Sequence, residues 1–216
     1  MKENTLEYLY SIKATKTSDG IPKGSFHSLK DCINRINYRD YDWAEFGTGY
    51  AVSTRYLHRF SRKFPGINIH TFDWFKGLPE AWQFSDGEIL TTDVPYDKGH
   101  LATPPNPILT EDNNIILYNG LFEDTVPEFA KKDIKLSFIN MDADIYSSTK
   151  TVFDNINHMI PKGCIIHFDE YYNYDAEDRW KEHEYKAFME WIDKYDRDFK
   201  YLGRGTGWQA WVEVTK

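Results

Sequence analysis

Residues 41–60 read YDWAEFGTGYAVSTRYLHRF, a short apolar segment followed by a glycine turn and a helical pattern. DWAEF has the apolar character of a buried strand, and the apolar residues after the turn recur at the spacing of a helix. Gly47 and Gly49 allow the backbone to pass close to a ligand, and the helix start at Tyr50 offers unpaired N–H groups. This stretch is typical of folds that hold a nucleotide-like cofactor.

Strand and helix patterns alternate along the rest of the chain. Continuously apolar strands separated by helices indicate a parallel sheet that is covered on both faces. The glycine-rich end, residues 199–214, predicts a hairpin and therefore an antiparallel edge. The expected fold class is α/β: a Rossmann-like sheet, mostly parallel with a C-terminal antiparallel hairpin, and with helices on both faces. The expected strands are residues 42–46, 67–73, 115–120, 134–144 and 163–172, and the expected helices are residues 25–37, 50–64, 123–132, 147–160 and 178–195.

The chain divides into an N-terminal arm and one domain. Residues 1–24 are polar and end in SDGIPKG, which predicts a flexible arm, and residues 25–216 carry the alternating pattern of a single domain. Within this domain, residues 78–114 combine many prolines with little periodicity, so we expect a lid-like insertion over a substrate. The aromatic side chains of this insertion predict stacking on a ring of the substrate; they are Trp82, Phe84 and Tyr96.

Composition narrows the class of protein. A formal net charge of -8 over 216 residues argues against a nucleic-acid partner, because such proteins usually carry a basic face. Cys32 and Cys164 are too few for a disulfide framework. No apolar run approaches the length of a membrane span, so we expect a cytoplasmic protein without a membrane partner. Nothing in the sequence decides the oligomeric state, and a homo-oligomer stays open.

The charges around the glycine turn indicate the kind of cofactor. Glu45 would repel a phosphate but suits a ligand with an ammonium or sulfonium group, and Asp73 ends the next strand, where a carboxylate can accept both ribose hydroxyls. Val52 stands where the dinucleotide fingerprint has its third glycine, which disfavours a nicotinamide cofactor. Residues 146–150, YSSTK, match the Tyr-x-x-x-Lys pattern of short-chain dehydrogenases. An NAD(P)-dependent oxidoreductase is therefore kept as a distant alternative.

Four acidic residues follow two expected strands, in NMDADIY and HFDEYY: Asp142, Asp144, Asp169 and Glu170. Carboxylates that converge in a cleft repel one another strongly unless a cation neutralises them or some are protonated. Oxygen ligands favour a hard cation such as Mg²⁺, with Ca²⁺ or Mn²⁺ as alternatives. Asp169 and Glu170 can both bind such an ion only where the chain bends. In the simpler interpretation Asp144 caps the helix near Ser147, and Asp169 and Glu170 are solvated acids of a loop.

Three histidines have different expected roles. His167 lies on a buried strand, which favours a hydrogen-bonded core histidine over a catalytic base. His183, in KEHEYK, has the surroundings of an exposed helix face. His100 lies in the lid-like insertion, within reach of a substrate.

Five motifs, in order and spacing, resemble the macrocin O-methyltransferase family, which are metal-dependent class I methyltransferases that use S-adenosylmethionine (SAM). They are EFGTGYAVST, FDWFKGLPEAW, NGLFEDTVP, MDADIYSSTKTVFDNI and KGCIIHFDEYY, and the resemblance covers about residues 41–214. It implies the seven-stranded SAM-binding sheet with a terminal antiparallel strand. The residues that it implies for SAM binding are Glu45, Gly47, Thr48, Gly49, Tyr50, Asp73, Asn119, Gly120 and Phe122.

The same resemblance implies the chemistry. Mg²⁺ or another hard divalent cation would be held by Asp142, Asp169 and Glu170, with Asp144 as the general base. Glu170 stands where the family usually has an aspartate. The expected activity is transfer of a methyl group from SAM to a hydroxyl of a small molecule that is sugar-like or natural-product-like. The alternatives are N-methylation of a small molecule and a SAM-binding protein without catalysis.

Overall fold

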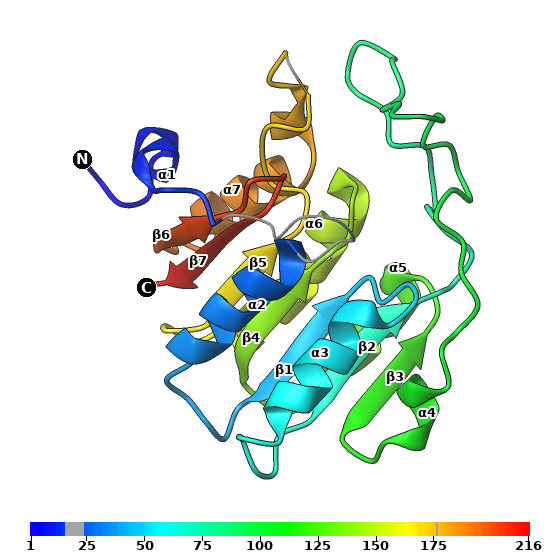
Figure 1. Cartoon of the computed structure of the whole chain (residues 1–216), viewed down its shortest axis with the longest axis vertical. Helices are drawn as coiled ribbons and strands as arrows, with labels where there is room; N and C mark the ends of the chain where they lie inside the picture. The colour runs from blue at the N-terminus through cyan, green and yellow to red at the C-terminus, as the bar shows by residue number, and fades with distance from the viewer. Residues whose placement is uncertain (16–23, 176) are drawn as a thin grey trace.

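The computed structural model describes residues 1–15, 24–175 and 177–216, and seven of its strands form one sheet in the order β3-β2-β1-β4-β5-β7-β6 (Figure 1). The strands from β1 to β5 are parallel, and β7 is antiparallel to both β5 and β6. The predicted fold class is confirmed. The strands are β1 Asp42–Phe46, β2 Ile69–Asp73, β3 Ile115–Asn119, β4 Leu136–Met141, β5 Ile165–Phe168, β6 Phe199–Arg204 and β7 Ala210–Val214.

Helices cover both faces of this sheet. In Figure 1, α2 and α3 lie in front of the sheet, and α5, α6 and α7 lie behind it. The helices are α1 Leu6–Ser11, α2 Gly24–Arg35, α3 Val52–Ser61, α4 Ile108–Glu111, α5 Phe122–Phe129, α6 Tyr146–Ile156 and α7 Glu184–Lys194, with short 3-10 turns at Asn157–Met159 (η1) and Arg179–Glu182 (η2). No helix in the described part of the chain is long and apolar enough to cross a bilayer.

The central strand β4 is buried along its whole length and supplies both layers of the core. Phe138 packs with Leu29 of α2 and Leu57 of α3 on one face of the sheet. Ile139, the next residue, packs on the opposite face with the cluster that contains Val152 of α6. Alternate residues of a strand point to opposite faces, so a strand covered on both sides must be apolar throughout. This explains the continuous apolar pattern of β4.

The described part of the N-terminal segment packs against the sheet edge. Leu9 of α1 is fully buried, and the backbone N–H of Tyr201 in β6 donates to the Glu3 carbonyl at 2.8 Å. Arg204 donates through Nε to the Ile12 carbonyl, also at 2.8 Å. The predicted flexible arm covered residues 1–24, of which residues 16–23 lie outside the described residues. The first half of the predicted arm is thus held by β6.

The predicted insertion leaves the sheet after β2 and runs as an irregular chain until α4 (Figure 1). Its base is closed by two backbone hydrogen bonds of 2.8 Å, from Leu78 N–H to the His100 carbonyl and from Gly99 N–H to the Leu78 carbonyl. Trp82 and Phe84 are 1% and 4% exposed and pack against other side chains of the protein. The expectation that they stack on a substrate is therefore wrong, because the fold buries both rings.

Candidate cofactor and metal site

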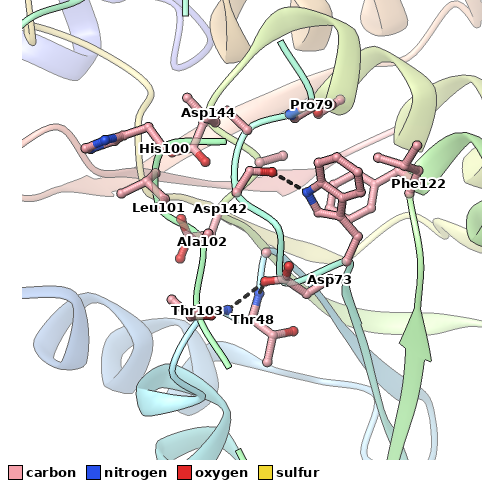
Figure 2. A pocket seen from close by; sticks show the side chains of 18 of the residues that line it. Thr48, Asp73, Pro79, His100, Leu101, Ala102, Thr103, Phe122, Asp142 and Asp144 are labelled. Carbon is pink, nitrogen blue, oxygen red and sulfur yellow. Dashed lines mark hydrogen bonds between the residues drawn. The ribbon is translucent and has the colours of Figure 1, made fainter. Parts of the chain in front are cut away.

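A cavity of about 460 Å³ opens where the carboxyl ends of β1 and β4 meet. In an open α/β sheet this is the point where the strand order reverses, and ligands bind there. Figure 2 shows the lid segment from His100 to Thr103 on one side of the cavity and Phe122 on the opposite side. The predicted site residues that line it are Gly47, Thr48, Gly49, Tyr50, Asp73, Gly120, Phe122, Asp142 and Asp144.

The glycine turn has two different structural requirements. Gly47 has φ +87, and a Cβ placed there would lie 1.7 Å from the carbonyl oxygen of Asp142. Gly49 has φ +48, and a Cβ there would meet nothing within 4 Å. The first glycine therefore lets β1 and β4 approach each other. The second faces open space beside the cavity, as expected for a position that a ligand must approach.

Asp73 organises this turn. Its Oδ2 accepts hydrogen bonds from the backbone N–H groups of Thr48 and Gly49 at 3.0 and 2.8 Å (Figure 2). Its Oδ1 accepts from Phe75 N–H at 2.7 Å. Each carboxylate oxygen can accept more than one hydrogen bond, so Asp73 retains acceptor capacity toward the cavity. The N–H groups of Thr48 and Gly49 are already engaged.

Glu45 does not reach the cavity. Its side chain is fully buried beneath the turn, where Oε1 accepts from Asn140 Nδ2 at 3.1 Å and Oε2 accepts from the Thr54 hydroxyl. The sequence predicted a direct contact between Glu45 and the cofactor. Glu45 is absent from the lining of the cavity, because its side chain is held beneath the turn by Thr54 of α3 and Asn140 of β4.

Burial gives Glu45 a pH-dependent effect on stability. Burial raises the pKa of Glu45 from 4.5 to about 7, against the lowering effect of its hydrogen bonds with Thr54, Ser53 and Asn140. Between these values the native state retains a proton that the unfolded chain has released, so the free energy of unfolding falls as pH rises from about 4.5 to about 7.

We expect Glu45→Gln to remove this dependence. Glutamine keeps the acceptor for Asn140 and cannot ionise, so the stability of the variant relative to wild type should rise by about 3 kcal/mol between pH 4.5 and pH 8. Denaturant unfolding at both pH values measures the difference. Parallel changes in the two proteins would show that Glu45 ionises normally in the fold.

Residues after β3 form the remaining wall of the cavity. Gly120 and Phe122 line it, and the Gly120 N–H donates to the Asp73 carbonyl at 3.0 Å. Asn119 is exposed and lies outside the lining. Of the predicted segment, the structure thus brings Gly120 and Phe122 to the cavity but not Asn119.

The acidic residues converge at the ends of β4 and β5. Asp142, Asp144 and Glu170 each have a carboxylate oxygen within 4.8 Å of the others. Glu170 is 8% exposed, and its Oε2 has no hydrogen-bond partner among the described residues. Asp169 is not a member of this trio. β5 ends at Phe168, so the chain bends before the acids and Glu170 turns inward.

None of the ion pairs between described residues includes Asp142, Asp144 or Glu170. Burial, followed by the charges of Asp169 and Asp142, raises the pKa of Glu170 well above its usual range. Burial and the charges of Asp169 and Asp144 do the same to the pKa of Asp142. Carboxyl groups in this state need either protons or a cation. Three carboxylate oxygens form a donor set that suits a hard divalent ion.

Asp144 occupies a strained turn. Its φ is +63, and the Ile145 N–H donates to the Ala143 carbonyl at 2.6 Å across it. Burial, then the charges of Asp169 and Asp73, raises the pKa of Asp144 to about 7. The simpler interpretation, in which Asp144 caps the helix, is wrong: Ile145 is the N-cap of α6, and the Asp144 side chain makes no cap hydrogen bond to it.

The structure confirms the predicted environment of one histidine and contradicts that of another. His167 is fully buried between the Ser28 hydroxyl at 2.7 Å and the Asn140 amide at 2.8 Å, which confirms a core histidine. Burial lowers its pKa to about 4. His183 is 4% exposed, so the predicted exposed face is wrong: the chain breaks between η2 and α7 and turns this ring inward. His100 lines the cavity.

One buried acid was not anticipated. Glu184, the first residue of α7, is fully buried, and its Oε1 accepts from the Ala143 N–H at 3.1 Å.

The two residues that match the Tyr-x-x-x-Lys pattern of dehydrogenases do not line the cavity. Tyr146 donates through its hydroxyl to Glu190, and Lys150 forms ion pairs with Asp154 and Glu190. That pair therefore lies within an ion network between α6 and α7.

The strand order, the glycine turn and the acidic cavity at the switch point define a class I SAM-dependent methyltransferase. Within this class, a match to a family profile identifies the family. Residues 66–199 match the profile of the macrocin-O-methyltransferase (TylF) family, which is more than half of the chain, so the chain belongs to this family.

Solved structures show the same fold at low sequence identity. The calicheamicin methyltransferase CalS11 has a TM-score of 0.66 and 19% identity, with 87% of this chain and 79% of that chain covered. The O-methyltransferase NovP has a TM-score of 0.67 and 18% identity, with coverages of 91% and 81%. The O-methyltransferase from Bacillus cereus in complex with SAH has a TM-score of 0.51 and 15% identity, with coverages of 93% and 83%. A search of curated proteins gives no significant match.

Proposed function

We propose that this protein transfers the methyl group of SAM to a hydroxyl of a small sugar-like or natural-product-like molecule, with the help of a divalent cation. One observation carries the proposal: Asp144, whose pKa burial and neighbouring charges raise to about 7, lines the same cavity as the glycine turn and has a carboxylate oxygen within 4.8 Å of those of Asp142 and Glu170. A base and a cation site next to a SAM cavity are what deprotonation of a weakly acidic hydroxyl requires.

The cavity has features that fit SAM. Gly49 leaves open space at the turn, and Asp73 retains acceptor capacity for ribose hydroxyls. Thr103, on the lid side, is 8% exposed, and its hydroxyl has no partner among the described residues. Phe122 offers an apolar surface for the adenine. Bound there, SAM supplies a methyl group that needs no further activation.

The acidic cluster has features that fit a cation. Asp142 and Glu170, whose carboxylate oxygens lie within 4.8 Å of each other, would hold it, and the unpartnered Oε2 of Glu170 is the donor that the fold leaves available. The third acid of the proposed set is Asp169, which precedes Glu170 in the chain and lies outside the trio of the site. A divalent cation bound there would lower the pKa of the acceptor hydroxyl through its positive charge. N-methylation does not need this charge, so the cluster favours a hydroxyl acceptor over an amine.

The chain's own residues then position and deprotonate the acceptor. Asp144 takes the proton of the hydroxyl, so that the oxygen can approach the methyl carbon in line. The lid segment at His100 and Leu101 closes the side of the cavity and reduces the access of water. Tyr50, Val52 and Leu101 line the cavity and are 62%, 49% and 46% exposed. They would contact an apolar part of the acceptor that projects from the mouth.

We expect S-adenosylhomocysteine to bind the purified protein at micromolar concentration in isothermal titration calorimetry. Methyl transfer from labelled SAM to a panel of glycosides and sugar nucleotides should then depend on Mg²⁺ and stop when EDTA is added. Binding without transfer to any acceptor would favour a non-catalytic SAM-binding protein. Folded protein that does not bind S-adenosylhomocysteine would contradict the proposal.

A further inference from the structure

The turn that carries Asp144 is unfavourable on its own. A three-residue turn with φ +63 at its centre, closed by the 2.6 Å bond between Ile145 and Ala143, is the rare γ-turn in which an L-residue is strained. Strain of this kind persists only where the surrounding structure holds it in place. Something outside the turn must therefore stabilise it.

Two consecutive residues at the start of α7 hold this turn from both sides. Glu184 Oε1 accepts a hydrogen bond from the Ala143 N–H, before Asp144, at 3.1 Å. His183 Nδ1 accepts one from the Tyr146 N–H, after Asp144, at 3.3 Å. The same dipeptide thus contacts the backbone on both sides of Asp144, just after the end of β4.

Burying these two polar side chains has a cost. Glu184 is fully buried and His183 is 4% exposed, while Glu184 Oε2 and His183 Nε2 have no hydrogen-bond partners among the described residues. An unpartnered buried polar atom is unfavourable, and an acid in the first turn of a helix could interact with the helix dipole from the surface instead. The buried arrangement therefore serves the contacts with the turn more than the stability of α7.

His183 also contacts the lid. The Trp82 and Phe84 rings lie edge-on to the imidazole, with centroids at 5.7 and 5.4 Å. Outside this contact, Arg179 of η2 pairs with Asp86 and Glu88 of the lid at 2.8 and 2.6 Å. The position of the lid and the geometry of the Asp144 turn therefore meet at a single side chain.

We propose that His183 and Glu184 are positioning residues, a two-point clamp that holds the strained Asp144 turn in place and links it to the docked lid. The proposal rests on the proposed function in one respect, the role of Asp144 as the base. The clamp itself consists of hydrogen bonds from backbone N–H groups to these two side chains, so it can be tested without any turnover.

The test compares paired substitutions. Glu184→Met and His183→Phe remove the acceptor atoms at similar volume, whereas Glu184→Gln and His183→Asn keep an acceptor oxygen near the same position. Phe188→Leu perturbs a fully buried residue of the same helix and serves as a control for general destabilisation. Amide hydrogen exchange over residues 141–146 is measured by mass spectrometry for all five variants.

We expect exchange over residues 141–146 to rise about tenfold or more in Glu184→Met and His183→Phe, because the N–H groups of this segment lose their hydrogen-bond acceptors and with them their protection. Glu184→Gln and His183→Asn should restore most of the protection, and Phe188→Leu should leave this segment close to wild type. In an assay with a methyl acceptor, kcat should fall in the same order while S-adenosylhomocysteine affinity stays within about twofold.

Two results would overturn the clamp. One is unchanged exchange over residues 141–146 in Glu184→Met and His183→Phe. The other is a general rise across the chain that Phe188→Leu reproduces. If the exchange results agree with the clamp but wild type transfers no methyl group to any acceptor, the role of Asp144 fails while the clamp stands. The two proposals are thus separated by different readouts.

Discussion

Asp144→Asn should lower kcat by about 10³-fold and leave the affinity for S-adenosylhomocysteine unchanged. General bases contribute about 10²- to 10⁴-fold to catalysis, and asparagine has nearly the same shape but cannot accept the proton. The side chain lines the cavity beside the strained turn, and Asp73, not Asp144, makes the hydrogen bonds that organise the glycine turn. Steady-state kinetics and calorimetry on the same preparation measure both quantities.

The pH dependence of the wild type gives a second readout. Burial and the neighbouring charges of Asp169 and Asp73 raise the pKa of Asp144 to about 7. A base must be deprotonated to act, so kcat/KM should rise with pH through the pKa of this group and level off above it. A bound cation favours the ionised carboxylate and moves the rise to lower pH. The kcat/KM of Asp144→Asn should not show this rise with pH.

A parallel variant separates the base from the cation site. Asp142, Asp144 and Glu170 lie together, so position alone would allow Asp144 to be a ligand. We expect Asp142→Asn to lose Mn²⁺ binding, measured by electron paramagnetic resonance, and Asp144→Asn to keep it. Loss of Mn²⁺ in both variants would make Asp144 a ligand and remove it from the role of base.

The sequence predicted the sheet and the general location of the site because both depend on short-range patterns. Acids directly after two adjacent parallel strands must meet at one edge of the sheet, as Asp142 and Glu170 do. The two glycines were recognisable for the same reason, since a turn between a buried strand and a helix has few residues and strict backbone requirements. These inferences needed no knowledge of contacts between distant segments.

What the sequence did not predict depends on such contacts. Glu184 is 14 positions after Glu170, and an acid in the first turn of a helix usually signals a solvated residue. His183 was expected on an exposed face because the break between η2 and α7 leaves no clear pattern in KEHEYK. Trp82 was expected to face a substrate, yet packing against His183 and Tyr174 buries it. Burial of these residues is decided by the tertiary fold.

Gly47→Ala should destabilise the fold by more than about 4 kcal/mol and abolish S-adenosylhomocysteine binding. At φ +87 an L-residue is strained by about 1–2 kcal/mol, and the added Cβ would lie 1.7 Å from the Asp142 carbonyl oxygen. That oxygen belongs to the backbone at the end of β4 and cannot move without displacing Asp142 from the acidic cluster. Denaturant unfolding and calorimetry measure the two losses.

Gly49→Ala is the matched control, because it adds the same atom two residues later in the same turn. Its Cβ would meet nothing within 4 Å, and its φ of +48 lies in the left-handed region, so the cost should stay at about 1–2 kcal/mol. Equal destabilisation by both substitutions would mean that backbone strain alone explains the two glycines. A much larger effect at Gly47 would show that the approach of β1 to β4 is what this position requires. It is also the approach that brings the cofactor turn and the acidic cluster into one cavity.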